Sequence, residues 1–291
     1  MISPNLKLFL EQQLSKQLSR SIHILQVNHV GGGSINRTYQ IALDTKENFF
    51  LKINDADIYP GLFEKERLGL ESLRPFLRTP EVVLKEVFNE HQLLVMEWIA
   101  QGPKTEGFWK EFGGKLAALH RHNGTSFGLN YDNYMGSLEQ SNTWSDTWVN
   151  FFREQRLERQ VKLAVENGLL PKRWLKNLEN LYTQLPSIFP EEKPCLLHGD
   201  LWSGNFICDQ QQMPVLIDPA VYYGHRSVDL AMTTLFGTLH PLFYEAYHAH
   251  FPLPDNYTEQ WEIANLYPLL IHLNLFGGSY LESITQTLKR F

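Results

Sequence analysis

The stretch Leu196–Asn205, L-L-H-G-D-L-W-S-G-N, constrains the fold of this chain more than any other segment. An apolar run leads into Asp200, and Asn205 follows five residues later. A second apolar run then ends at Asp218. A tight turn between two buried strands would explain H-G-D alone. It would not explain the amide and the second carboxylate that follow, so the segment favours a functional site.

These three polar side chains fit the chemistry of phosphoryl transfer. The spacing from Asp200 to Asn205 matches the Asp and Asn of the kinase catalytic loop H-R-D-x-x-x-x-N. Asp200 is therefore the candidate base. Asp218 could hold Mg²⁺, because this ion prefers oxygen ligands and usually takes one or two carboxylates together with phosphates. A short loop and an adjacent hairpin can bring these groups to one γ-phosphate.

Composition excludes several other functions. The 291 residues carry a net charge of −6 without a long basic block, so nucleic acid and anionic membranes are not predicted partners. No apolar run approaches the roughly 18 residues of a transmembrane helix, and residues 1–20 lack the apolar core of a signal peptide. Cys195 and Cys208 fit neither a disulfide scaffold nor a metal motif. We expect buried thiols and a cytoplasmic protein.

The first hundred residues predict a helix followed by a sheet of about five antiparallel strands. Leucines repeat every four residues from Leu6 to Leu18, which indicates one face of a helix over residues 4–18 that Ser3 can cap. The predicted strands cover residues 22–30, 38–43, 49–53, 82–88 and 93–96. A second helix is expected over residues 60–77.

A glycine-rich loop joins the first two predicted strands. Gly31, Gly32, Gly33 and Ser34 precede Ile35 and Asn36. Glycine lets the backbone approach a ligand closely, and strand–loop–strand is the context of a phosphate-covering flap. A P-loop would instead lead into a helix and end in Gly-Lys-Ser/Thr. A flexible hairpin turn is the alternative interpretation of this loop.

Lys52 lies inside the apolar strand Phe49–Ile53, where an unpaired ammonium group would be costly to bury. Glu66 lies 14 residues later on the apolar stripe of the predicted helix, whereas Glu64 lies off it. We therefore predict a Lys52–Glu66 ion pair, with the lysine also binding nucleotide phosphates. Glu64 is the alternative partner, and an edge-strand lysine directed to water is the alternative for Lys52.

The segment beginning at Glu97, Trp98 and Ile99 interrupts the strand pattern. We predict that its backbone hydrogen-bonds the adenine of a nucleotide. The expected domains are a nucleotide-binding lobe over residues 1–97, a hinge over residues 98–103 and a mostly helical lobe over residues 104–291. This is an α+β fold.

The helices predicted in the second lobe cover residues 105–120, 144–167, 172–185, 228–236, 242–250 and 260–276, with a terminal helix ending at Lys289. His120 and His122 do not share a helix face, so a metal site there is disfavoured. Arg153, Arg156 and Arg159 are expected to be solvated or salt-bridged. For Asp229 we prefer a structural role near a helix N-terminus, where a carboxylate favours the helix dipole.

The order of these features resembles the small-molecule branch of the protein-kinase-like fold, and within it the fructosamine kinase (ketosamine-3-kinase) family. The similarity extends over nearly the whole chain, and the tryptophan after H-G-D-L is its most specific mark. The motifs that carry it are G-G-G-S-I-N at 31–36, D-N-Y-M-G-S at 132–137, H-G-D-L-W-S-G-N at 198–205, D-P-A-V-Y-Y-G-H-R at 218–226, D-L-A-M at 229–232 and H-L-N-L-F-G-G-S-Y at 272–280.

The resemblance implies ATP- and Mg²⁺-dependent phosphorylation of the sugar 3-hydroxyl of a ketoamine, free or on glycated lysine. Asp200 would be the base, and Asn205 and Asp218 would bind Mg²⁺. The lysine–glutamate pair and the glycine loop would hold ATP. The residues expected to bind substrate are Trp202, Tyr222, Tyr223 and His225.

Two alternatives remain: an aminoglycoside- or choline-type phosphotransferase, and a non-catalytic protein with a kinase shape. The filled catalytic positions disfavour the second. Many family members have Asp-Arg-Glu where this chain has His225-Arg226-Ser227, which affects the predicted specificity for sugar or amine.

Overall fold

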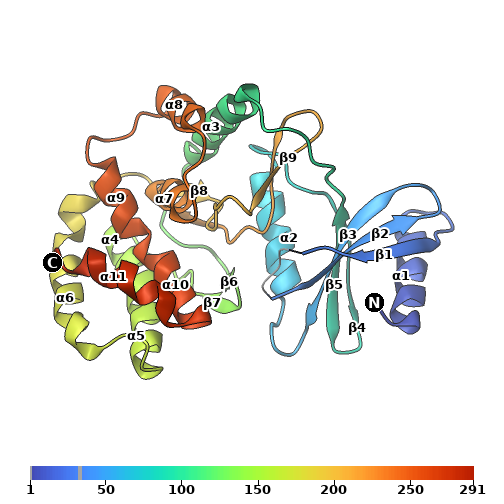
Figure 1. The fold of residues 1–291 in the computed structure, drawn as a ribbon, viewed down its shortest axis with the longest axis horizontal. Coiled ribbons are helices and arrows are strands. Elements are labelled where there is room, and N and C mark those ends of the chain that lie inside the picture. Colours follow the sequence, from blue (N-terminus) through green and yellow to red (C-terminus); the bar gives the residue numbers. More distant parts are fainter. Residues whose placement is uncertain (1, 32–34) are drawn as a thin grey trace. The chain divides into compact units, whose positions relative to one another are not determined.

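The computed structural model describes residues 2–31 and 35–291, and the chain folds into two compact units (Figure 1). Unit 1 comprises Met1–Pro103 and Ile207–Ile217, and unit 2 comprises Lys104–Phe206 and Asp218–Phe291. The sequence-based division placed residues 207–217 in the C-terminal lobe, but they pack within unit 1. There the backbone N–H of Leu216 donates to the carbonyl of Arg78 at 2.9 Å.

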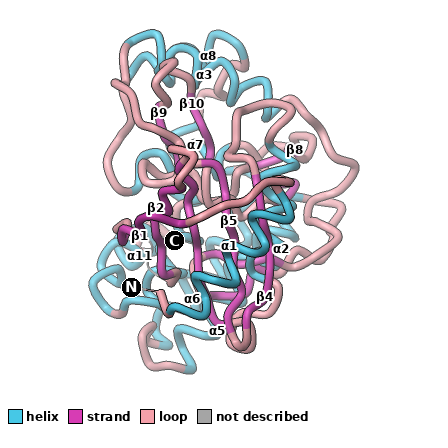
Figure 2. The backbone as a smooth tube through the Cα atoms, turned by 90° about the vertical axis from the view of Figure 1, so that its right-hand side faces the viewer, coloured by secondary structure: helices cyan, strands magenta, loops and turns pink. Residues whose placement is uncertain are grey.

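Unit 1 contains the predicted antiparallel sheet of five strands, in the order β1-β2-β3-β5-β4 (Figure 1). Figure 2 draws the strands in magenta. The strands are β1 (Ile24–His29), β2 (Arg37–Leu43), β3 (Asn48–Asp55), β4 (Val82–Phe88) and β5 (His91–Glu97). This order makes β3 the central strand. A residue on β3 is therefore flanked by hydrogen-bonded neighbours on both sides.

The helices of unit 1 are α1 (Pro4–Gln17) and α2 (Leu62–Leu73). The side chain of Ser3 accepts a hydrogen bond from the backbone of Leu6, which caps α1 as predicted. The leucine stripe of α1 is buried and packs into the same core as the inner side chains of the sheet. Burying each such side chain contributes about 2 kcal/mol to stability. The second helix is shorter than the predicted span of residues 60–77.

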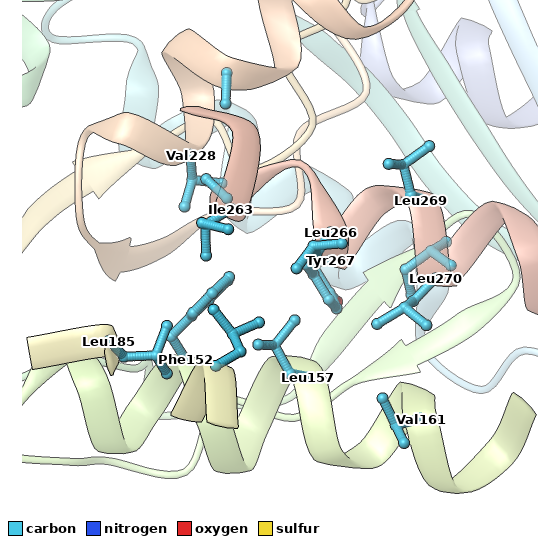
Figure 3. Close-up of a cluster of buried hydrophobic side chains, with 14 of the residues drawn as sticks. Phe152, Leu157, Val161, Leu185, Val228, Ile263, Leu266, Tyr267, Leu269 and Leu270 are labelled. Atoms are coloured by element: carbon cyan, nitrogen blue, oxygen red, sulfur yellow. The ribbon is translucent and has the colours of Figure 1, made fainter. Parts of the chain in front are cut away.

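Unit 2 is mostly helical, and Figure 3 shows part of its apolar core. Its helices are α3 (Glu106–His120), α4 (Trp148–Phe151), a π-helical segment (Phe152–Glu158), α5 (Arg159–Glu166), α6 (Leu175–Ile188), α7 (Ser227–Leu235), α8 (Pro241–His250), α9 (Tyr257–Ala264), α10 (Leu266–Phe276) and α11 (Leu281–Leu288). Short strands pair as β6 (Asn133–Met135) with β7 (Leu138–Gln140), and β8 (Cys195–Leu197) with β11 (Tyr222–Gly224). The remaining pair, β9 (Phe206–Cys208) with β10 (Pro214–Leu216), belongs to unit 1 except for Phe206.

Three predicted helices of unit 2 differ from the structure by more than one residue at an end. The helix predicted over residues 144–167 begins at Trp148 and contains the π-helical segment. The helix that precedes β8 continues past Pro186 to Ile188, and the burial of Leu185 and Ile188 in the core offsets the hydrogen bond that proline cannot donate. The span predicted as one helix over residues 260–276 consists of α9 and α10, separated at Asn265. Among the described residues, no helix is long and apolar enough to cross a membrane.

The interior of unit 2 contains a charged side chain that the sequence placed in solvent. Arg156 is fully buried and donates to uncharged acceptors, so the prediction that it is solvated or salt-bridged was wrong. Its guanidinium group donates to the carbonyl of Ser141 and, at 2.7 Å, to Oδ1 of Asn142. The same group lies 4.0 Å from the ring centroid of Tyr222. Carbonyl acceptors and an aromatic face thus replace water around this cation.

We predict that Arg156→Ala lowers the free energy of unfolding by about 2–4 kcal/mol, because it leaves a cavity and removes donors from buried acceptors. Urea denaturation of the purified variant measures this loss. The matched control is Arg153→Ala, which removes an exposed arginine paired with Glu158 and should cost less than about 1 kcal/mol. Equal losses in the two variants would contradict the prediction.

Candidate active site

The predicted ion pair of unit 1 is present. Nζ of Lys52 donates to Oε1 of Glu66 at 2.6 Å, and the two side chains are 2% and 9% exposed. Lys52 lies on β3, the central strand, so it is not an edge-strand lysine directed to water. Glu66 faces it from the buried side of α2. Burying two charges is favourable only when they are paired, and this pair satisfies that condition.

The alternative partner, Glu64, is engaged elsewhere. Its carboxylate accepts hydrogen bonds from Arg67 and Lys85, each at 2.7 Å. These bonds lower the pKa of Glu64 to about 2. Glu64 is also partly exposed, whereas Glu66 is buried. The apolar stripe on α2 therefore identified the correct glutamate.

The glycine loop lies mostly outside the described residues, because Gly32, Gly33 and Ser34 belong to the undescribed segment. Gly31 is described, and an added Cβ atom there would meet nothing within 4 Å. The role of this loop in covering phosphates stays a prediction.

The segment predicted to bind adenine begins at the end of β5. The N–H of Glu97 donates to the carbonyl of Glu81 at 2.8 Å, and the carboxylate of Glu97 pairs with Arg78. This N–H is therefore committed to the sheet. The ring of Trp98 packs 6.3 Å from that of Phe50. Nucleotide binding by Glu97, Trp98 and Ile99 stays a prediction.

The H-G-D turn of unit 2 follows β8 and requires a glycine. Gly199 has a φ of +83°, and a Cβ atom there would lie 2.0 Å from the carbonyl oxygen of Ala220. Only glycine combines this left-handed backbone with such a close approach. The turn thereby brings Asp200 directly beyond the end of the strand.

A buried carboxylate holds this turn in place. The two carboxylate oxygens of Asp229, in the first turn of α7, accept the N–H groups of His198 at 2.7 Å and Gly199 at 2.8 Å. The imidazole Nε2 of His120 lies 3.1 Å from the same carboxylate. The sequence predicts for Asp229 only a structural role near a helix N-terminus. Its position in the first turn of an apolar helix, shortly after the catalytic segment, was the signal that could have indicated this contact with the turn.

The surroundings of Asp229 favour its charged form. Burial raises the pKa of this carboxyl, but the hydrogen bond and electrostatic attraction of His120, with the N–H of Gly199, bring the pKa below its ordinary value. Nδ1 of His120 lies 2.8 Å from the hydroxyl of Tyr247, so this histidine joins a buried chain of hydrogen bonds. The described residues contain no cluster of three or more His, Cys, Asp or Glu side chains that could hold a metal.

Asp200 and Asn205 interact as their spacing predicts. Nδ2 of Asn205 donates to the carboxylate Oδ2 and to the backbone carbonyl of Asp200, both at 2.8 Å. Burial raises the pKa of Asp200 to about 7, the Asn205 bond opposes this shift, and the negative charge of Asp218 adds to it. The carboxylates of Asp200 and Asp218 are therefore close enough to interact electrostatically. This is expected if Asp200 is the base and Asp218 is the metal ligand of the same active site.

Asp218 has an unusual backbone conformation. Its φ of +55° is in the left-handed region, which is uncommon for residues other than glycine. Such strain often accompanies a functional side chain. The carboxylate of Asp218 and Oδ1 of Asn205 are oxygen donors of the kind that Mg²⁺ prefers, and this ion needs few protein ligands when phosphates complete its shell. The donor set therefore fits the expected metal.

Two of the four residues predicted to bind substrate are buried in the structure. Tyr222 is fully buried beneath Arg156, and His225 is 1% exposed with its Nδ1 atom 2.8 Å from the hydroxyl of Ser227. Burial lowers the pKa of His225 to about 4, so this histidine is neutral near pH 7. Other elements cover both side chains, which sequence spacing does not show. Trp202 and Tyr223 are half-buried and stay candidates.

Comparisons with known proteins agree with this geometry. The family model described as fructosamine kinase matches residues 8–291. A probable ketoamine kinase of Enterococcus faecium is 41% identical over 268 residues, covering 90% of this chain and 94% of that protein.

The chain belongs to the fructosamine kinase family.

Two further relatives of this fructosamine kinase extend the comparison. The chloroplastic protein-ribulosamine 3-kinase of Arabidopsis thaliana is 37% identical over 272 residues, covering 91% of this chain and 82% of that protein. The solved structure of a putative fructosamine-3-kinase from Thermobifida fusca has a TM-score of 0.85 at 31% identity, covering 96% and 97% of the two chains. Macrolide and aminoglycoside 2′-phosphotransferases, 12–15% identical, share the fold alone.

Membership identifies the chain as a phosphotransferase with a protein-kinase-like fold, and a kinase of this family uses ATP. The departure at residues 225–227 of this fructosamine kinase lies in a buried segment. There Arg226 binds Glu192 through two hydrogen bonds of 2.9 and 3.0 Å and lies 3.8 Å from the ring centroid of Phe251. Glu192 thus supplies a carboxylate partner for this arginine from another part of the chain.

We predict that Glu66→Gln lowers kcat/KM for ATP at least about tenfold, because the buried ammonium of Lys52 loses its charged partner. Steady-state kinetics with varied ATP measures the effect. Glu64→Gln is the matched control on the same helix, and it should change kcat/KM less than about twofold. A larger loss in the control would reassign the functional glutamate.

Proposed function

We propose that this kinase transfers the γ-phosphoryl group of ATP to the sugar 3-hydroxyl of a ketoamine, in the presence of Mg²⁺. The observation that carries the proposal is the Asp200 carboxylate held by the Asn205 amide in the turn after β8. The fructosamine kinase family match supports ketoamines as the substrate class. The names of the relatives from Enterococcus and Arabidopsis support the same class.

Asp200 would accept the proton of the attacking hydroxyl. A positioned base must lie within hydrogen-bond reach of that proton, and the Asn205 amide restricts the carboxylate to one orientation. The backbone bonds of Asp229 fix the turn that carries Asp200, so the base keeps its position during transfer. Positioning supplies much of the catalysis in phosphoryl transfer.

The residues proposed to bind the nucleotide and its metal are those predicted from the sequence. Lys52, kept in place by Glu66, would bind phosphate oxygens, and the glycine loop would cover them. Asn205 and Asp218 would hold Mg²⁺, which neutralises the charge of the phosphates when bound. The adenine would meet the backbone after β5.

The substrate would be a ketoamine that is free or attached to a protein lysine. The name of the Arabidopsis relative, a protein-ribulosamine 3-kinase, supports a ketoamine on protein. Phosphorylation at the 3-hydroxyl would make the adduct fall apart and free the amine. Both cysteines are buried thiols, which fits the proposed cytoplasmic location. An ADP-release screen over glycated amines, aminoglycosides and choline tests the substrate class. Turnover of an aminoglycoside without any ketoamine would overturn the proposal.

We predict that Asp200→Asn lowers kcat by about 10²–10⁴-fold, because the amide cannot accept the hydroxyl proton. The measurements are ADP release with fructoselysine and calorimetric titration with ATP. The nucleotide should still bind with nearly the wild-type affinity. An unchanged kcat would remove Asp200 from the mechanism.

We predict that Asp218→Asn raises the Mg²⁺ concentration for half-maximal turnover at least about tenfold, because a charged ligand is replaced by a neutral one. Asparagine tolerates the left-handed backbone at this position, so the fold should persist. The control is Asp255→Asn at an exposed position. Coinciding Mg²⁺ titration curves for the wild type and Asp218→Asn would refute the assignment.

A further inference from the structure

A row of aromatic rings leads away from the catalytic turn within unit 2. The ring of Trp202 contacts Phe236 at the end of α7, with centroids 5.9 Å apart, and Phe236 contacts His272 on α10 at 4.8 Å. His272 in turn contacts Phe276 at 5.5 Å and Tyr280 at 5.1 Å. We call these five side chains the aromatic row.

The outer part of the aromatic row is open to solvent. Phe276 is 54% exposed and Phe236 is 38% exposed. Among the residues that the structure describes, these are the two exposed phenylalanines. The exposed part of each ring gains nothing from the hydrophobic effect, and a contiguous exposed apolar patch often marks a binding surface.

A left-handed glycine after α10 allows the last ring of the aromatic row to reach its position. Gly277 ends α10 with a φ of +87°, and the 3₁₀ turn Gly278–Tyr280 then returns Tyr280 to the side of His272. The segment H-L-N-L-F-G-G-S-Y, which phosphoryl transfer does not otherwise explain, thus supplies three of the five rings. Two glycines in succession permit a reversal that other residues would resist.

The row is continuous with the catalytic turn. The N–H of Trp202 donates to the carbonyl of Asp200, and the carbonyl of Trp202 accepts from the N–H of Asn205. The indole lies over Gly204, where an added Cβ atom would be 2.3 Å from the ring. Gly204 and these backbone bonds therefore restrict the orientation of the Trp202 ring. The aromatic row begins at Trp202, two residues after the candidate base Asp200.

We propose that the aromatic row is the subsite for the amine-derived part of the ketoamine, and that it favours amines with an aromatic or aliphatic group near the nitrogen. This inference rests on the proposed function. In a ketoamine the nitrogen is bonded to C1, two carbons from the reacting 3-hydroxyl. A sugar held at Asp200 therefore directs its amine substituent only a few ångströms away, within reach of a surface that begins at Trp202.

The chemistry of the row suits that group. A secondary amine is largely protonated near neutrality, and aromatic faces attract such a cation. Burial lowers the pKa of His272, so its ring is neutral and does not repel the amine. Beyond the nitrogen, the open rings of Phe236 and Phe276 can stack on a hydrocarbon substituent.

The test compares two ketoamines with the same fructose unit, the benzylamine and methylamine adducts. We measure kcat/KM for both with the wild type, Phe236→Ala, Phe276→Ala and the control Trp144→Ala. The control removes an exposed ring, 49% exposed, outside the row. The wild type should prefer the benzylamine adduct. Each phenylalanine variant should lower the benzyl-to-methyl ratio about three- to tenfold, which is the size of one aromatic contact. The control should leave this ratio unchanged.

Each other outcome is decisive. An unchanged ratio in both phenylalanine variants, with ketoamine turnover intact, would overturn the subsite but not the proposed function. A wild type that phosphorylates neither adduct nor fructoselysine would overturn the proposed function and this inference with it. Size-exclusion chromatography of the same proteins adds a third outcome. A dimer that Phe276→Ala dissociates, without a change in the ratio, would assign the row to self-association instead.

Discussion

The arrangement of the catalytic unit depends on the buried carboxylate of Asp229. Its two oxygens accept the N–H groups of His198 and Gly199, which would otherwise be unsatisfied donors in the interior. Hydrogen bonds to a charged acceptor are stronger than neutral ones, so this contact fixes the turn more firmly than a backbone bridge would. Because His120 binds the same carboxylate, α3 and α7 are joined to the turn at one point.

Close backbone approaches set the remaining geometry of the site. Gly199 lies against the carbonyl of Ala220, and Gly204 lies beneath the indole of Trp202. A methyl group at either position would displace Asp200 or Trp202. Asp218, which follows the hairpin of β9 and β10, has a left-handed backbone conformation. These three positions fall within twenty residues, in the segment where the chemistry is proposed.

The ion pair of unit 1 positions a charged group and is not a clear source of stability. Exchanging a buried ion pair for apolar residues is often neutral or stabilising, so Lys52 and Glu66 are weak evidence of a contribution to stability. Their position on a central strand and a buried helix face instead fixes the ammonium group in one place. A fixed cation suits phosphate binding. Arg156 shows the other use of a buried cation, because carbonyls and aromatic rings of the core surround it.

The sequence alone determined the features of the protein that depend on local geometry. The five-residue spacing of Asp200 and Asn205 places both side chains on one turn, and the helical period distinguished Glu66 from Glu64. Apolar runs separated by turn residues likewise predicted the five strands. Only the tertiary structure decided which residues are buried by segments that are distant in the sequence. Neighbours in the sequence do not show that other elements bury Tyr222, His225 and Arg156, or that Asp229 reaches back 30 residues to the turn.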